Sequence, residues 1–309
     1  MKRALVLCLL LFCRLSSANA QTTGIAVERM FLQSGPSAFF QVQGAEVAAP
    51  SSLWLHSAVL LLSSPLVLRH RYTGELLAVP VKHRVTLDVG GELGLWKQRL
   101  SMTFGLPVAL WQDGDRLQNT GGTDDFSTAP LRASAVGDIR LGLKMRLTAP
   151  HLFWGFLTAF EATIPGGGQT DFVATDGMTV SPKLAGFFRK GFVSAALEVA
   201  ARLAPLRKLY ETTLQHSVEW GAAVSGAVPV PRVGLAFIGE AVGAYNVAGA
   251  ISSTELRGGG RLAAGTWALD VGAGGGFGPL SPPWRVFVSF RVVFQKREPA
   301  FCPHTPVAL

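Results

Sequence analysis

The sequence predicts an all-β protein whose fold is an antiparallel up-and-down transmembrane β-barrel of about twelve strands. Three observations lead to this expectation. Apolar residues alternate with polar or charged residues along many segments. Short turns and longer polar or Gly/Pro-rich links separate these segments in alternation, as in bacterial outer-membrane barrels. The chain also begins with the features of an export signal.

The composition agrees with a membrane protein that has no helical span. Of the 309 residues, 49% are hydrophobic, only 16% are charged, and 35 are glycine. No run reaches the roughly 18 to 20 uncharged apolar residues that a membrane-spanning helix needs. We therefore expect the hydrophobic residues to serve strands.

The first twenty residues predict a cleaved signal peptide. Lys2 and Arg3 precede an apolar run over 4–12, and Ala-Asn-Ala at 18–20 provides a cleavage site, so we expect the mature chain to begin at Gln21. Cleavage would remove two of the three cysteines and leave only Cys302, so the mature chain would contain no internal disulfide. It would also lower the formal charge of +8 by three.

The segment GDIRLGLKMRL, residues 137–147, shows the strand pattern most clearly. On a helix its charged and apolar side chains would mix around the whole circumference. On a strand they separate, because successive side chains point to opposite faces. Arg140, Lys144 and Arg146 then share one face, and the other face is purely apolar.

The same alternation, with a first strand near 54–62, predicts strands over 54–62, 81–95, 99–111, 137–147, 152–164, 179–189, 192–203, 212–228, 232–245, 253–262, 267–277 and 284–294. The longer links are expected at 63–80, 112–136, 165–176, 204–211, 247–252 and 278–283. An even number of strands would place both chain ends on one side of the barrel.

Two architectures could use strands of this kind. A soluble, secreted β-sandwich would bury the apolar faces between two sheets and leave the charges in water. A membrane barrel would turn the apolar faces toward lipid and the charges toward a lumen. The strand lengths, the export signal and aromatic residues near strand ends favour the barrel. These aromatic residues are Trp96, Trp111, Trp154, Trp267 and Trp284.

In the barrel, the charged faces would line the lumen. The basic members of this predicted pore-lining set are Lys82, Arg84, Arg99, Arg140, Lys144, Arg146, Lys183, Arg202, Arg257, Arg261, Arg285 and Arg291. The acidic members are Asp88, Glu92, Asp138, Glu161, Glu198, Glu219, Glu240, Glu255 and Asp270. The basic excess would favour anions in an open water path. Alternatively, the charges could pair with one another and plug the barrel.

Nothing in the sequence indicates an enzyme, a cofactor or a metal. None of the six histidines lies in a nucleophile motif, and no cluster has metal-ligand spacing. The run PGGGQTD at 165–171 lacks the Lys-Ser/Thr end of a phosphate-binding loop. In an exported, strand-rich protein, the positive charge is not interpreted as nucleic-acid binding.

Four segments carry a resemblance to known families. They are ALWQDGDRL at 109–117, AVGDIRLGLKMRL at 135–147, EATIPGG at 161–167 and DGMTVSPKLAGFFRKG at 176–191. They resemble the N-terminal barrel region of large OmpA-type outer-membrane proteins, and they are similar to phenol-degradation MetA-pathway-like outer-membrane barrels. The resemblance implies an outer-membrane barrel over most of residues 30–294. OmpA-type proteins continue into a peptidoglycan-binding domain, whereas this chain ends fifteen residues after Phe294.

The predicted organisation is a signal peptide (1–20), an N-terminal extension (21–52), a transmembrane barrel (53–294) and a periplasmic tail (295–309). We expect a bacterial outer-membrane protein that acts as a passive channel or transporter for small polar or anionic solutes. Its expected partners are membrane lipid and, through Phe294, the barrel-assembly machinery. The competing interpretation is a plugged structural or surface-recognition barrel without transport.

Overall fold

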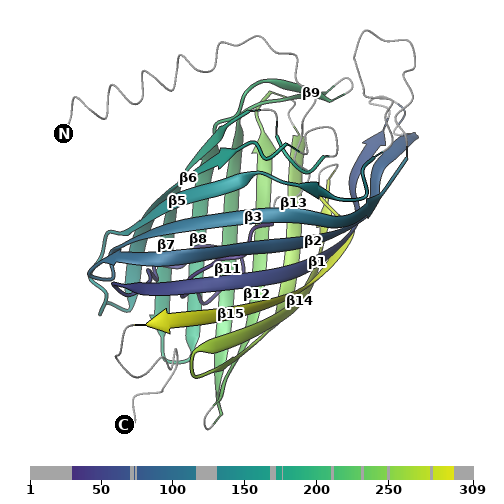
Figure 1. The fold of residues 1–309 in the computed structure, drawn as a ribbon. Coiled ribbons are helices and arrows are strands. Elements are labelled where there is room, and N and C mark those ends of the chain that lie inside the picture. Colours follow the sequence, from purple (N-terminus) through teal and green to yellow (C-terminus); the bar gives the residue numbers. More distant parts are fainter. Residues whose placement is uncertain are drawn as a thin grey trace, which may run out of the picture.

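The chain folds into a closed β-barrel in the computed structural model (Figure 1). The structure describes residues 30–69, 73, 75–115, 131–167, 172–175, 177–209, 212–230, 233–248, 251–278 and 281–295. The predicted signal peptide lies outside the described residues, and so does the predicted C-terminal tail except Gln295, which belongs to the last strand. Along the described ranges, no helix is long and apolar enough to cross a membrane.

Twelve antiparallel strands form the ring. They are β1 (Ser52–Arg69), β2 (Leu76–Trp96), β3 (Leu100–Asp113), β5 (Ile139–Arg146), β6 (Trp154–Ile164), β7 (Thr179–Lys190), β8 (Val193–Arg202), β11 (Ser217–Val230), β12 (Val233–Asn246), β13 (Ile251–Ala264), β14 (Trp267–Phe277) and β15 (Trp284–Gln295). The short strand β4 (Ala135–Val136) extends the sheet beside β3, and β9 (Arg207–Leu209) pairs with β10 (Thr212–Leu214) in a separate hairpin.

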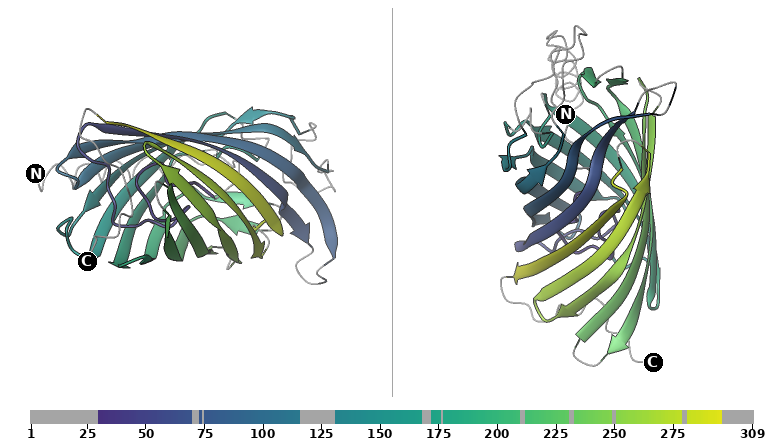
Figure 2. Two further views of the ribbon diagram at one scale, coloured as in Figure 1. Left: turned by 90° about the horizontal axis from the view of Figure 1, so that it is seen from below. Right: turned by 90° about the vertical axis from the view of Figure 1, so that its right-hand side faces the viewer.

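Pairing between the first and last strands closes the ring. The β1–β15 register runs without interruption from Ser52 opposite Gln295 to Ser63 opposite Trp284. No long strand of the ring is therefore left with an unpaired edge, which is the condition for a sheet in a membrane. Figure 2 shows that the strands are tilted relative to the barrel axis, as barrel closure requires. Ser52 and Gln295 mark the turn end of the barrel, where the short connections lie; the opposite end is called the loop end.

The structure confirms the fold class and about twelve strands, and it corrects two strand boundaries. The segment 63–80, expected as a long link, is mostly strand, since β1 extends to Arg69 and β2 begins at Leu76. A register shift between Ser63 and Leu66 lets β1 continue past its Ser-Ser-Pro sequence. The strand expected over 212–228 is divided, because 212–214 pairs with β9 and β11 begins at Ser217.

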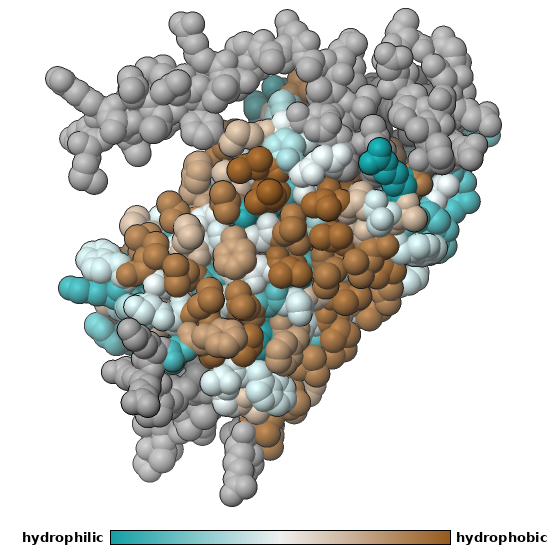
Figure 3. Space-filling view, viewed as in Figure 1, coloured by the Kyte–Doolittle hydropathy of each residue, from teal (hydrophilic) through white to brown (hydrophobic). Residues whose placement is uncertain are grey.

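The two faces of the wall differ in polarity as predicted. In β5, Ile139, Leu141, Leu143 and Met145 are exposed on the outside, while Arg140, Lys144 and Arg146 are buried inside. On the side of the barrel seen in Figure 3, apolar side chains cover much of the outer face. The soluble sandwich alternative is wrong, because a single closed sheet presents its apolar face outward.

Residues 30–51, which we name the lumenal segment, fill the middle of the barrel. They form no strand or helix, and Figure 1 shows them as a coil within the ring. Phe39, Phe40 and Ala45 are almost completely buried. An eight-stranded barrel is just wide enough to be filled by its own side chains, whereas much larger barrels hold water. In this barrel of intermediate size, a piece of chain occupies the additional space.

Candidate functional site: the occupied lumen

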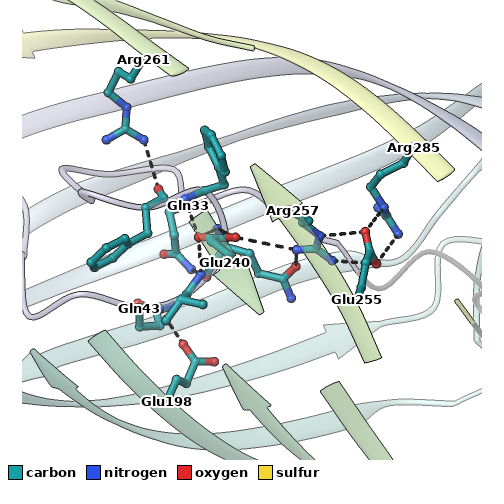
Figure 4. A network of polar contacts seen from close by, with 12 residues as sticks. Gln33, Gln43, Glu198, Glu240, Glu255, Arg257, Arg261 and Arg285 are labelled. Carbon is teal, nitrogen blue, oxygen red and sulfur yellow. Dashed lines mark hydrogen bonds and ion pairs between the residues drawn. The ribbon is translucent and has the colours of Figure 1, made fainter. Parts of the chain in front are cut away.

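Glu240 on β12 provides the most extensive contact with the lumenal segment. Its Oε1 accepts hydrogen bonds from three successive backbone N–H groups, those of Phe40 (2.7 Å), Gln41 (3.0 Å) and Val42 (3.3 Å). Figure 4 shows this carboxylate facing the segment from the wall. Hydrogen bonds to a charged acceptor are stronger than neutral ones. Glu240 therefore stabilises a tight bend of the segment at mid-lumen.

Two further wall carboxylates bind backbone N–H groups of the segment. Glu198 on β8 accepts from Gln43 at 2.7 Å, and Glu92 on β2 accepts from Ala48 at 2.9 Å. These strands lie on different sides of the ring, so the segment is attached across the lumen. Alternation identifies all three glutamates as inward-facing, but nothing in their spacing indicates that their partner is main chain.

Wall arginines complete this arrangement by donating to carbonyl oxygens of the segment. Arg291 donates to Gly35 O at 3.2 Å, and Arg261 donates to Ser37 O and to Phe39 O, the latter at 3.1 Å. Buried backbone groups are costly when they lack partners. The wall thus supplies both hydrogen-bond donors and acceptors to the backbone of the segment, which forms no strand.

An apolar cluster inside the lumen also holds the segment. Phe40 packs edge-on against Phe287 of β15, with ring centroids 4.8 Å apart, and Phe39 packs against Phe187 of β7 at 6.5 Å. Leu60 of β1 belongs to the same buried cluster. The alternation of the strands did not predict this cluster. A signal for it was present, because the run AVLLL at 58–62 is apolar at consecutive positions, as expected for a strand buried on both faces.

The remaining lumenal charges mostly form close pairs within the wall. Arg140 binds Asp88, which also contacts His56 at 3.3 Å, and Lys144 lies 2.9 Å from Glu92. On β13, β14 and β15, Arg257 and Arg285 share Glu255 (2.8 and 2.5 Å), and Arg261 and Arg291 share Asp270 (2.7 and 2.6 Å).

Glu46 of the lumenal segment is a further charge partner that sequence analysis did not single out. It binds Arg189 of β7. Burial raises the pKa of the Glu46 carboxyl, and the positive charges of Arg189 and then Arg146 act in the opposite direction. The lumenal segment therefore contributes a charge to the lumen. The alternation of residues in the strands does not predict this charge.

Two members of the predicted pore-lining set lie outside the lumen. Lys82 is about half exposed near the loop end and pairs with Asp115 at 2.7 Å, and this hydrogen bond from Lys82 lowers the pKa of the Asp115 carboxyl. Arg99 is exposed beside the β2–β3 turn. Asp138 is buried just before β5, and the other members of the set lie on the inward side of their strands. Their role in permeation remains a prediction.

A cavity of about 120 Å³ lies in the lumen beside the lumenal segment. Phe31, Gln33 and Val42 of the segment line it, and Val173 and Ser281 from the β6–β7 and β14–β15 loops line it too. This volume is enough for several waters. The lining residues place the cavity between the segment and the loop end.

Part of the β6–β7 loop covers the loop end of this cavity. Thr175 donates from its backbone N–H (2.9 Å) and its hydroxyl (2.8 Å) to Asp138, and Arg84 donates to Phe172 O at 3.1 Å. Ala174 is fully buried. The described lumen is thus obstructed twice, by the lumenal segment in its middle and by this part of the β6–β7 loop toward the loop end.

Comparison with solved structures supports the fold. No family model matches the chain, and no curated protein matches its sequence. The COG4313 outer-membrane channel from Pseudomonas putida F1 has a similar structure, with a TM-score of 0.59 and 14% identity over 81% of this chain and 98% of that chain. LpxR from Salmonella typhimurium (TM-score 0.44, 9% identity, 78% and 99% covered) and the CymD monoaromatic hydrocarbon channel (0.40, 10%, 81% and 90%) are more distant. The chain therefore has the fold of outer-membrane β-barrels, while its resemblance to OmpA-type proteins stays a prediction.

Proposed function

We propose that this protein spans the bacterial outer membrane as a non-enzymatic channel for small polar solutes, closed at rest by its lumenal segment. The apolar outer face and the fold shared with outer-membrane barrels support the location. The charged inner wall supports a water-filled path for polar solutes once the segment and the covering part of the β6–β7 loop both move.

The observation that carries the proposal is the way in which the segment is held. Residues 30–51 add no strand to the sheet, so their displacement would break no wall ladder. Their polar contacts with Glu240, Glu198 and Glu92 can be exchanged for water. The segment can therefore leave while the barrel stays intact.

The proposal does not keep the preference for anions that the basic excess predicted. That count included Lys82 and Arg99, which lie outside the lumen. It also omitted Glu46 and its partner Arg189, whose opposite charges offset each other. The described lumenal charges are consequently close to balance, and charge selectivity depends on local groups.

Single-channel recording in planar bilayers tests the proposal. We expect the refolded mature protein to show rare openings, and Glu240→Ala to open more often because three backbone N–H groups lose their acceptor. Glu75→Ala, which removes the same charge from an exposed position, is the control and should behave like the unmodified protein. Equal, silent traces from all three folded proteins would contradict the channel.

A plugged structural barrel is the second candidate. The apolar cluster around Phe39, Phe40 and Phe287 favours it, because burial of large aromatic side chains gives a strong reason for the segment to stay. Silence of folded, inserted Glu240→Ala protein would support this candidate, and attention would move to the loops at the outer end.

A further inference from the structure

A groove of about 720 Å³ lies in the outer face of the wall, where β6, β7, β8, β11 and β12 are neighbours. We name it the outer groove. The large side chains that border it are aromatic or aliphatic and exposed: Trp154 and Phe156 of β6, Phe188 of β7, Leu197 of β8 and Val224 of β11. The outer groove therefore opens to the surroundings of the barrel and is separate from the cavity in the lumen.

Small residues form the floor of the outer groove. They lie on the outward face of four neighbouring strands and are Gly186, Ala195, Ala222, Gly239 and Ala241. The register joins them across the sheet, because Ala222 of β11 is opposite Ala241 of β12 on one side and opposite Leu197 of β8 on the other. A molecule in the groove can thus approach the backbone of several strands at once.

The aromatic border holds the outer groove open. Trp154 and Phe156 pack edge-on with ring centroids 5.8 Å apart, and Phe188 packs edge-on against Phe153 at 5.7 Å. A preformed site binds with a smaller cost of ordering. Once the barrel is inserted, lipid has to fill this groove, because the hydrocarbon core holds no water and empty space beside the wall forfeits dispersion contacts.

A positive charge lies at the turn end of the outer groove. Lys190 is two residues beyond Phe188 on β7, so its side chain leaves the same outward face about 7 Å further along the strand. Its cross-strand partner, Val193, is likewise two residues from Ala195 of the floor. Lys190 is exposed and forms no ion pair with any other residue that the structure describes. In a barrel with short periplasmic turns, this position is level with the phosphates of the periplasmic leaflet.

We infer that the outer groove binds one anionic phospholipid of the periplasmic leaflet, with its acyl chains in the groove and its phosphate against Lys190. The connections between β5 and β12 at this end, residues 147–153, 191–192 and 231–232, contain no acidic residue that would repel the headgroup. The volume lies within the roughly 300–1,000 Å³ that ligand sites usually have. The inference does not depend on the proposed channel, because the groove and the lumen lie on opposite faces of the wall.

Native mass spectrometry of the mature protein in detergent micelles tests the site. The probes are dioleoyl phosphatidylglycerol, dioleoyl phosphatidylcholine and dioleoylglycerol, which share their acyl chains and differ in the headgroup. We expect one phosphatidylglycerol to bind saturably. Phosphatidylcholine should bind about fivefold more weakly, because its choline offsets the phosphate charge, and dioleoylglycerol should bind no more tightly than phosphatidylcholine.

A pair of lysine variants tests the place of the headgroup. Lys190→Gln should weaken the binding of phosphatidylglycerol about fivefold and remove its advantage over phosphatidylcholine. Lys97→Gln removes the same charge from an exposed position in the β2–β3 turn at the same end of the barrel, away from the groove. This control should bind both lipids like the unmodified protein.

A pair of phenylalanine variants tests the place of the acyl chains. Ala222→Phe fills the groove with an apolar ring and should weaken the binding of all three lipids about tenfold. Ala201→Phe adds the same ring to the outward face of β8 beyond the groove and should have no effect. Heat-dependent migration on gels reports whether each variant is folded, and the lysine pair decides if Ala222→Phe does not fold.

Three results would overturn the inference. One is retention of several lipids without a saturable first site, as expected for unspecific lipid around the barrel. The second is phosphatidylcholine bound as tightly as phosphatidylglycerol by the unmodified protein. The third is equal lipid binding by the two lysine variants, or by the two phenylalanine variants when both are folded.

Discussion

At the scale of single residues, Gly94 shows how closely the lumenal segment approaches the wall. A Cβ atom at this position of β2 would lie 1.9 Å from Ala49 O and 2.6 Å from Ala48 O. Both atoms belong to backbone, so they cannot rotate away. The Ser51 N–H also donates to Gly94 O at 3.0 Å. The absence of a side chain at Gly94 therefore allows the end of the segment to pack against β2.

We predict that Gly94→Ala loosens the end of the segment and lowers the free energy of unfolding by about 1–3 kcal/mol, as overpacking does elsewhere. Urea unfolding of the barrel in lipid vesicles measures the change. Gly226→Ala is the matched control, because a Cβ atom there meets nothing within 4 Å. Equal stability of the two variants would contradict the close packing at Gly94.

At the scale of elements, β5 has the most regular alternation. Its eight residues alternate between exposed and buried without a break. Leu143 points outward with 48% exposure, while its neighbour Lys144 points inward and binds Glu92 and Gln33. A strand with this pattern can face lipid and lumen at once, and its register is fixed because a slip by one residue would exchange the two faces.

Leu143→Arg should destabilise the inserted barrel by roughly 2–4 kcal/mol if the side chain lies near the middle of the bilayer. Folding titrations in vesicles would measure this loss, with Leu143→Met as a control that keeps an apolar side chain of similar size. An arginine tolerated as well as methionine would mean that this face of β5 does not contact lipid.

The features of the fold that could be predicted from the sequence are those that depend on residues close together in the chain. Period-two alternation depends only on neighbouring residues, so it placed Leu143 outside and Lys144 inside. The same signal failed at the end of β1, where Ser64 adopts φ 44° and a bulge carries the strand past Pro65. The contact between Glu240 and Phe40 joins residues 200 positions apart. Such pairings depend on how the whole barrel closes, so the lumenal segment could not be placed from its own residues.

At the scale of the whole molecule, the distribution of tryptophans distinguishes the two sides of the wall. Trp220 on β11 is 43% exposed on the outer face, whereas Trp54 on β1 is 5% exposed and belongs to a buried cluster. A barrel embedded in a bilayer places the first side chain against acyl chains and shields the second. In a barrel dissolved in water, neither tryptophan would contact lipid.

We predict that brominated lipids quench the fluorescence of a variant that keeps only Trp220 and leave a variant that keeps only Trp54 nearly unchanged, because bromine quenches at contact range. Steady-state fluorescence of both variants in vesicles measures this difference. Equal quenching of the two variants would place both tryptophans against lipid. No quenching of either variant would contradict membrane insertion.

The continuity of the lumenal segment with β1 also constrains the order of biogenesis. Residue 51 leads directly into Ser52, the first residue of the seam with β15. Since β15 is the last strand of the ring along the chain, the seam cannot form until every other strand of the ring has been made. The segment can settle onto the inner face of the sheet before the seam forms, and the last strand then encloses it. Closure of the barrel and enclosure of the segment thus become a single late event.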